Sequence, residues 1–317
     1  MRIGLGCVNL GSASGGGTRA DVRLIRDAID RGITLFDTAD AYGSGSSERV
    51  LGRAIAPRRA AVEIATKAGY RFRSRSPGEQ ALRRIVRRVR PVRSAAHPAA
   101  LGGAAYSSQD FSPAHLRHAL ESSLRRLGTD HVDVFQLHGP REVLPDLVPS
   151  LQSLVAAGKT RRIGIGAERV EDAAAWLSVD GIDVVQVPFG VLDQQAARDV
   201  FPLARQRGVE IWARGVLGGG LLAAPARGEP VAIDDPKGPA ILALRRLADE
   251  TGIGIVELAV GFVRAHPDVS AVLLGTSSPD HLGRNLELMV APLLCGDVIE
   301  RLRSLFHEGH DDGDRDG

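Results

Sequence analysis

Short apolar runs alternate with helical segments along this chain, and the alternation limits the folds that it can adopt. Most runs are bounded by Gly, Asp or His, which is typical of strands buried in a parallel sheet. The expected strands are Ile3–Leu5, Ile33–Phe36, Val62–Ala65, Val132–Gln136, Ile163–Ile165, Val184–Gln186, Glu210–Trp212 and Val272–Leu274. Eight strands that alternate with helices predict an α/β fold, a (β/α)8 barrel of the TIM type.

The segments between the strands have the apolar periodicity of helices. We expect helices at Arg19–Arg31, Ser47–Ile55, Pro113–Leu127, Leu144–Ala157, Val170–Leu177, Gln194–Arg207 and Ile255–Ala265. An open doubly wound sheet is the alternative architecture. It is disfavoured because Gly4-Leu5-Gly6 lacks the third glycine that a dinucleotide-binding turn would place at the start of the first helix.

The composition is compatible with one globular enzyme. A chain of 317 residues fits a single barrel of this type, so we expect one domain over residues 1–317. The net charge of +2 gives no reason to expect nucleic acid or a membrane as a partner. No apolar run approaches the ~20 residues of a membrane span. Cys7 and Cys295 form no disulfide framework, and we expect a cytoplasmic protein.

Four polar residues lie where predicted strands end, at the edge that carries the chemistry in barrels of this type. Asp37 and Tyr42 follow the second strand, Lys67 follows the third and His138 follows the fourth. Each alone has an ordinary interpretation, such as an Asx-turn for Asp37 or a solvated strand end for Lys67. Together they predict one shared pocket. The histidines have no metal-ligand spacing with nearby acids, so we expect no metal.

The motifs around these four residues resemble those of the aldo-keto reductase family. The matching stretches are Asp37 to Gly43, Ala65 to Lys67 and Gln136 to His138, and the resemblance extends from about residue 2 to about residue 288. It implies NAD(P)H-dependent reduction of an aldehyde, ketone or keto-sugar, with the hydride supplied by the nicotinamide. Tyr42 would donate the proton after Lys67 lowers its pKa, Asp37 would hold Lys67, and His138 would orient the carbonyl.

The same resemblance assigns a further set of residues to the cofactor. They are Gln186 on the sixth strand, Arg214, Leu217 and Gly218 after the seventh, and Gly275, Ser277, His281, Arg284 and Asn285 after the eighth. Many members place Lys or Arg where Ser277 stands, to pair with the 2′-phosphate of NADP. Arg284 could take over that pairing, so NADPH is favoured and NADH remains possible. Gly166 and Ala167 replace side chains that often hold the nicotinamide amide, and Glu168 or backbone groups could substitute.

Two features depart from the family. Its barrels usually begin with a β-hairpin that closes the bottom, whereas here the first strand begins near Arg2, so the bottom is either open or filled by other side chains. Residues 68–111 form a long arginine-rich insertion in which Gly78–Arg90 could be a basic helix. We hypothesise that it overhangs the pocket and favours an anionic carbonyl substrate. Residues 309–317 form an acidic tail that we expect to be disordered.

The substrate side of the pocket is poorly defined by sequence. Cys7, Asn9, Tyr106 and Phe189 are candidate lining residues. The alternative function is a nicotinamide-binding regulatory or partner-docking module with little turnover. The complete set of Tyr42, Lys67, Asp37 and His138 favours an enzyme.

Overall fold

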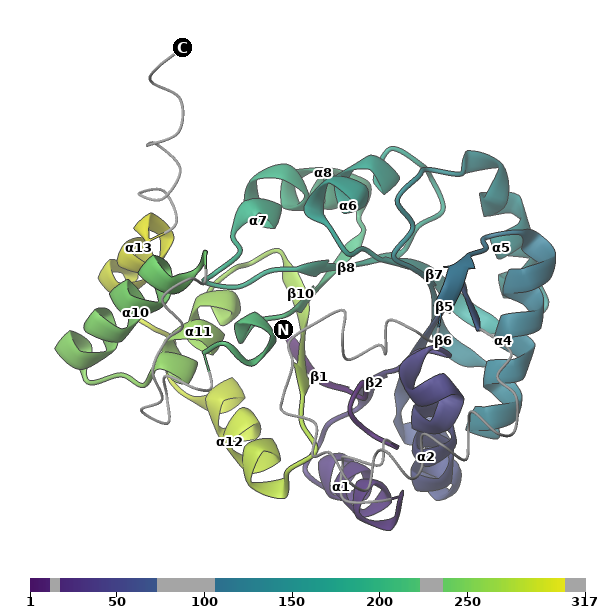
Figure 1. The fold of residues 1–317 in the computed structure, drawn as a ribbon, viewed down its shortest axis with the longest axis horizontal. Helices are drawn as coiled ribbons and strands as arrows, with labels where there is room; N and C mark the ends of the chain where they lie inside the picture. Colours follow the sequence, from purple (N-terminus) through teal and green to yellow (C-terminus); the bar gives the residue numbers. More distant parts are fainter. Residues whose placement is uncertain (12–17, 73–105, 223–235, 306–317) are drawn as a thin grey trace.

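The computed structural model describes residues 1–11, 18–72, 106–222 and 236–305. The predicted basic helix at Gly78–Arg90 and the acidic tail lie outside these ranges, as does most of the arginine-rich insertion. Eight parallel strands form a closed barrel at the centre, and helices surround it (Figure 1). Around the barrel the order is β1-β10-β9-β8-β7-β6-β3-β2. The predicted (β/α)8 architecture is confirmed.

Each predicted strand corresponds to one strand of the barrel. The strands are β1 (Arg2–Gly6), β2 (Leu35–Asp37), β3 (Glu63–Ala68), β6 (Val132–His138), β7 (Thr160–Gly166), β8 (Val184–Pro188), β9 (Glu210–Arg214) and β10 (Val269–Gly275). A second, antiparallel sheet of β4 (Tyr70–Phe72) and β5 (Tyr106–Gln109) lies in the connection after β3. This sheet is not apparent from the sequence.

The described helices are α1 (Thr18–Asp30), α2 (Ser46–Ile55), α4 (Pro113–Leu127), α5 (Val148–Ala156), α6 (Val170–Trp176), α7 (Gln195–Asp199), α8 (Phe201–Arg207), α10 (Gly238–Thr251), α11 (Ile255–Arg264), α12 (Pro279–Val290) and α13 (Gly296–Ser304). The single helix predicted at Gln194–Arg207 is wrong, because two helices, α7 and α8, occupy this range. Pro202 lies in the first turn of α8 and has no N–H to continue the preceding helix. None of the helices in the described ranges is long and apolar enough to cross a membrane.

Helix α4 shows how local sequence sets the boundaries of an element. The Ser112 side chain accepts a hydrogen bond from the His115 N–H at 3.3 Å, and Pro113 occupies the first turn. Gly128 then ends the helix in the left-handed conformation with φ +68°. Between these two ends, α4 packs against α2 and β3.

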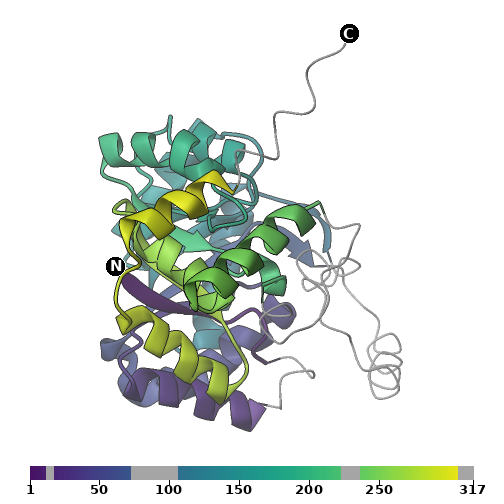
Figure 2. The same cartoon turned by 90° about the vertical axis from the view of Figure 1, so that its left-hand side faces the viewer.

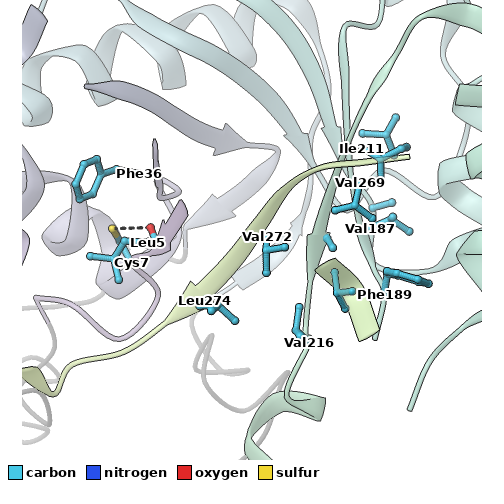
Figure 3. Close-up of a cluster of buried hydrophobic side chains, with 14 of the residues drawn as sticks. Leu5, Cys7, Phe36, Val187, Phe189, Ile211, Val216, Val269, Val272 and Leu274 are labelled. Atoms are coloured by element: carbon cyan, nitrogen blue, oxygen red, sulfur yellow. Dashed lines mark hydrogen bonds between the residues drawn. The ribbon is translucent and has the colours of Figure 1, made fainter. Parts of the chain in front are cut away.

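The outward faces of the strands form a continuous apolar layer beneath the helices. Side chains alternate along a strand, so every second residue points away from the barrel axis. Figure 3 shows such residues from five strands: Leu5, Phe36, Val187, Ile211 and Val272. All five are buried.

The inward faces fill the barrel with side chains, and Trp212 is the largest of the residues in this inner cluster. Inward residues from alternate strands share a layer, and the sheet register places Gly4 and Gly164 near the level of Trp212. Space is tight at both glycines: a Cβ on Gly4 would lie 2.5 Å from Leu273, and one on Gly164 would lie 3.0 Å from Gln136.

A ring of ion pairs closes the bottom of the barrel. This is the end at which β1 begins, beside the N label in Figure 2. Arg2 pairs with Glu63 at 2.5 Å and with Glu210 at 2.7 Å. Arg162 pairs with the same two acids. The guanidinium carbons of both arginines lie 6.0 Å from the centroid of the Trp212 ring. Charged side chains stacked on one indole therefore fill the bottom of this barrel.

Candidate active site

Asp37 and Lys67 form a buried ion pair at the carboxyl end of two neighbouring strands. Asp37 ends β2, and Lys67 lies next to the end of β3. The Lys67 ammonium donates to Asp37 Oδ1 at 2.5 Å and to the Thr38 carbonyl at 3.1 Å. Burial lowers the pKa of Lys67, but the carboxylate and the Tyr42 oxygen outweigh it, and the net pKa is raised. Lys67 therefore stays charged.

A sharp turn after β2 directs Tyr42 toward this ion pair. Gly43, Ser44 and Gly45 follow with φ of 58°, 55° and 80°, the left-handed region that favours glycine. A Cβ on Gly45 would lie 2.5 Å from the Arg126 side chain, so a larger residue does not fit there. The Lys67 ammonium lies 5.3 Å from the centroid of the Tyr42 ring, and its charge acts on the phenol oxygen.

The first turn of α2 anchors the Tyr42 turn from behind. Glu48 is fully buried, accepts a hydrogen bond from Thr66 at 2.7 Å and pairs with Arg126 of α4 at 2.5 Å. Ser47 donates to the Cys7 carbonyl at 2.8 Å. These contacts connect the turn to the end of β1, to β3 and to α4. They therefore hold the backbone that carries Tyr42 in place.

The pKa of Tyr42 departs from the sequence-based expectation. Burial raises it, and Asp37 adds to the rise. The charge of Lys67 lowers it but does not reverse the net shift. The expected fall of this pKa toward neutrality is therefore wrong in this structure, because desolvation of the phenolate outweighs the attraction of the ammonium. At neutral pH the phenol keeps its proton.

His138, the last residue of β6, is the fourth residue of the site and lies next to Tyr42. Its side chain is buried, and its ring lies 5.9 Å from that of Tyr42 in a T-shaped arrangement. Burial, together with the charges of Lys67 and Arg214, holds its pKa well below the usual range. The imidazole is therefore neutral and has one N–H to donate. The four residues that lie far apart in sequence meet at one rim of the barrel.

The β4–β5 sheet adds residues that the sequence analysis missed. The Tyr70 ring packs against His138 with centroids 4.9 Å apart, and its hydroxyl donates to Glu168 at 2.7 Å. Gln109 donates to the carbonyls of His138 and Gly139 at 3.1 and 2.8 Å. The one sequence signal for Tyr70 is its position three residues after Lys67, which places it close to the same rim.

Two of the candidate lining residues belong to the core instead. Cys7 is fully buried, and its thiol contacts the Leu5 carbonyl at 3.5 Å (Figure 3). Phe189 is buried against Phe201 at 4.8 Å and His266 at 5.4 Å between ring centroids. Tyr106 lies in β5, and Asn9 is exposed beyond β1.

Two amide side chains are buried just below the four polar residues, on β6 and β8. The Nε2 of Gln186 and both polar side-chain atoms of Gln136 have no hydrogen-bond partner among the described residues. Buried amides usually have a partner, so a polar ligand here would satisfy them. The carboxamide of a nicotinamide carries both a donor and an acceptor and fits this arrangement.

Arg214 reaches from the end of β9 toward the end of β7. Its Nη2 donates to the Ala167 carbonyl at 2.6 Å and contacts the Glu168 carbonyl at 3.4 Å. The guanidinium thus lies beside Ala167, one of the two positions where family members often carry longer polar side chains. Leu217 and Gly218 follow in the next turn, where Gly218 adopts φ +60°. Arg214 therefore supplies a fixed cation at this rim.

The remaining predicted cofactor residues lie on one segment formed by the end of β10 and the start of α12. Gly275, Ser277, His281 and Arg284 are exposed, whereas Asn285 is buried. Spacings of three and four residues place His281, Arg284 and Asn285 on one side of α12. The N-terminus of α12 opens directly after Ser278 and offers backbone N–H groups to a phosphate. In the described ranges no group of three or more acid, histidine or cysteine side chains could hold a metal.

Comparisons with known proteins identify the family and agree with the fold. The model of the aldo/keto reductase family matches residues 2–306. Over 304 residues the chain is 29% identical to aldo-keto reductase YhdN of Bacillus subtilis (strain 168), covering 89% of this chain and 82% of that protein. It resembles an aldo-keto reductase of Bacillus halodurans, solved in its holo form, with a TM-score of 0.78, 26% identity and coverage of 96% and 91%. For an aldo/keto reductase of Klebsiella pneumoniae in complex with NADP and acetate, the TM-score is 0.67, with 26% identity and coverage of 96% and 90%.

Proposed function

Because the chain belongs to the aldo/keto reductase family, we propose that it reduces a small carbonyl compound with Tyr42, Lys67, Asp37 and His138 as its catalytic residues. Family membership makes it an NAD(P)-dependent oxidoreductase. The observation that carries the residue assignment is the convergence of the four side chains. Asp37 pairs with Lys67 at 2.5 Å, the Lys67 ammonium lies 5.3 Å from the centroid of the Tyr42 ring, and that ring lies 5.9 Å from His138.

Bound NADPH would supply the hydride, which no side chain can provide. The Tyr42 hydroxyl donates the proton to the substrate oxygen, and its raised pKa keeps that proton available at neutral pH. Lys67 stabilises the phenolate that results, and Asp37 keeps Lys67 charged and in place. Neutral His138 donates a hydrogen bond to the same substrate oxygen and fixes its direction.

We assign the cofactor to the rim between β8 and α12. The residues are Gln186, Arg214, Leu217, Gly218, Gly275, Ser277, His281, Arg284 and Asn285. Gln186 would satisfy its unpartnered amide with the nicotinamide carboxamide. The N-terminus of α12 would hold a phosphate, and Arg284 is the cation available on that helix for the 2′-phosphate. An anionic substrate stays a prediction, since most of the arginine-rich insertion lies outside the described residues.

The test is the oxidation of NADPH by the purified chain in the presence of aldehydes, followed by the loss of nicotinamide absorbance. We expect steady turnover with 4-nitrobenzaldehyde and with an aldehyde that carries a carboxylate. Lys67→Met should retain NADPH binding and lose turnover, because its side chain has a similar length but no charge. Tight NADPH binding with no oxidation across a broad carbonyl panel would identify a binding module and refute the proposal. Parallel assays with NADH decide the cofactor preference.

A further inference from the structure

We propose that Tyr70 is a positioning residue that holds the imidazole of His138 in its working orientation. The inference rests on the role proposed for His138, and nothing in the family motifs assigns it. Tyr70 lies on β4, in the connection that the sequence analysis treated as an insertion.

The side chain of His138 lacks the anchor that usually orients a functional histidine. Such a ring commonly hydrogen-bonds through its second nitrogen, which fixes both its tautomer and its rotation. Here Nδ1 is buried and has no hydrogen-bond partner among the described residues. The backbone is held, because Gln109 donates to the His138 carbonyl and the Gly139 N–H donates to the Gly166 carbonyl at 2.9 Å. These backbone contacts do not stop the ring from rotating.

Ring packing therefore has to set the orientation of the imidazole. Tyr70 meets it at 4.9 Å with an interplanar angle of 81°, and Tyr42 meets it at 5.9 Å with an angle of 85°. Two edge-to-face contacts leave the ring little freedom to turn. Tyr70 is the nearer of the two. The orientation of Tyr42 is also constrained by Lys67. We therefore assign the orientation of the His138 ring mainly to Tyr70.

Tyr70 is itself fixed in place. Its hydroxyl donates to Glu168 at 2.7 Å, and its backbone pairs with Gln109 across the β4–β5 sheet. Burial and the Glu168 carboxylate raise the pKa of Tyr70, so its phenol remains a hydrogen-bond donor. The phenol proton is therefore engaged by the Glu168 carboxylate. The contacts thus point to positioning for Tyr70 and leave acid catalysis to Tyr42.

A double-mutant cycle tests whether Tyr70 acts through His138. With 4-nitrobenzaldehyde at saturating NADPH, Tyr70→Leu should lower kcat about tenfold or more, because small misplacements of an orienting group are costly. KM should change less than kcat, and the dissociation constant of NADPH should stay the same. Tyr70→Phe keeps the ring and should retain kcat within about threefold. Phe111→Leu, which removes a ring packed against Gly69 in the same connection, is the matched control.

In the His138→Gln background, Tyr70→Leu should lower kcat by less than about twofold, because residues that act as a unit are not additive. An equal loss in both backgrounds would mean that Tyr70 acts on the substrate directly, and the inference would be wrong.

A second measurement does not depend on turnover. The imidazole signal of His138 in a histidine-labelled sample is identified by its absence in His138→Gln. Tyr70→Leu should shift this signal and raise the pKa of His138, because the imidazole becomes more exposed to solvent. Tyr70→Phe and Glu168→Gln should cause smaller changes. An unchanged signal in Tyr70→Leu would overturn the inference. If the wild type reduces no carbonyl but the signal responds as expected, the proposed function fails and the positioning contact stands.

Discussion

Asp40 should make the stability of this protein fall as the pH rises. It lies between Asp37 and Tyr42, is 1% exposed, and has one carboxyl oxygen without a partner among the described residues. Burial raises the pKa of Asp40 from 3.8 to about 8, with a further rise from Glu48 that Arg126 and the Ala41 N–H oppose. Between these two values the folded chain holds a proton that the unfolded chain has released.

The sign and size of the effect follow from that difference. The folded state binds more protons, so the free energy of unfolding decreases with pH, by about 1.4 kcal/mol per pH unit. The contribution is complete below the unfolded pKa of 3.8 and is lost as the pH rises to about 8. From about pH 5.5 to about pH 7.5 the loss from this one group is on the order of 3 kcal/mol.

Asp40→Asn removes the titration while keeping the shape of the side chain. The amide oxygen can still accept from the Ala41 N–H, and the amide nitrogen can donate to the nearby Glu48. The free energy of unfolding is measured with urea, followed by circular dichroism, across this pH range. The value for the variant minus that for the wild type should increase by about 1.4 kcal/mol per pH unit. Asp249→Asn, on the exposed face of α10, controls for the loss of one charge. Parallel pH profiles for the wild type and Asp40→Asn would refute the reasoning.

Three further predictions concern the barrel bottom, its interior and the cofactor. Glu63→Gln should lower the free energy of unfolding in urea titrations by about 1–2 kcal/mol, because Arg2 and Arg162 would then share only Glu210 as an acidic partner. The loss should be smaller at high salt. An unchanged free energy of unfolding at low salt would contradict a stabilising role for the ring of ion pairs. Gly4→Ala should cost about 1–3 kcal/mol in the same assay. Its new Cβ would lie 2.5 Å from Leu273, whereas Gly296→Ala, with nothing within 4 Å, should be tolerated. Arg284→Leu should raise the NADPH dissociation constant about tenfold and leave that of NADH unchanged; equal changes for both cofactors would exclude a contact to the 2′-phosphate.

The features that the sequence predicted well are those with a local physical cause. Buried parallel strands require short apolar runs, and all eight of these runs coincide with strands of the barrel. The rim residues Asp37, Lys67 and His138 could be placed together because parallel strands share one carboxyl end. The Ser112-Pro113 start of α4 is likewise local in origin.

The features that the sequence did not predict depend on contacts between distant residues. The β4–β5 sheet pairs Tyr70 with Gln109 across an insertion, and neither segment has an alternating pattern that identifies it. The ring beneath Trp212 forms only when four strand starts converge. The net shift of the Tyr42 pKa depends on how deeply its oxygen is buried, which a motif does not encode. Pro202 is an exception, since its missing N–H is a local signal that the helix prediction overlooked.

The proposed function depends above all on the Tyr42 hydroxyl supplying the proton while Lys67 and His138 hold the reacting groups. Rapid mixing of NADPH-saturated wild type and Tyr42→Phe with 4-nitrobenzaldehyde measures the first turnover directly. We predict that Tyr42→Phe lowers the single-turnover rate at least about 100-fold and leaves the NADPH dissociation constant unchanged, since a positioned acid contributes this much or more. A single-turnover rate in Tyr42→Phe equal to that of the wild type would contradict the claim.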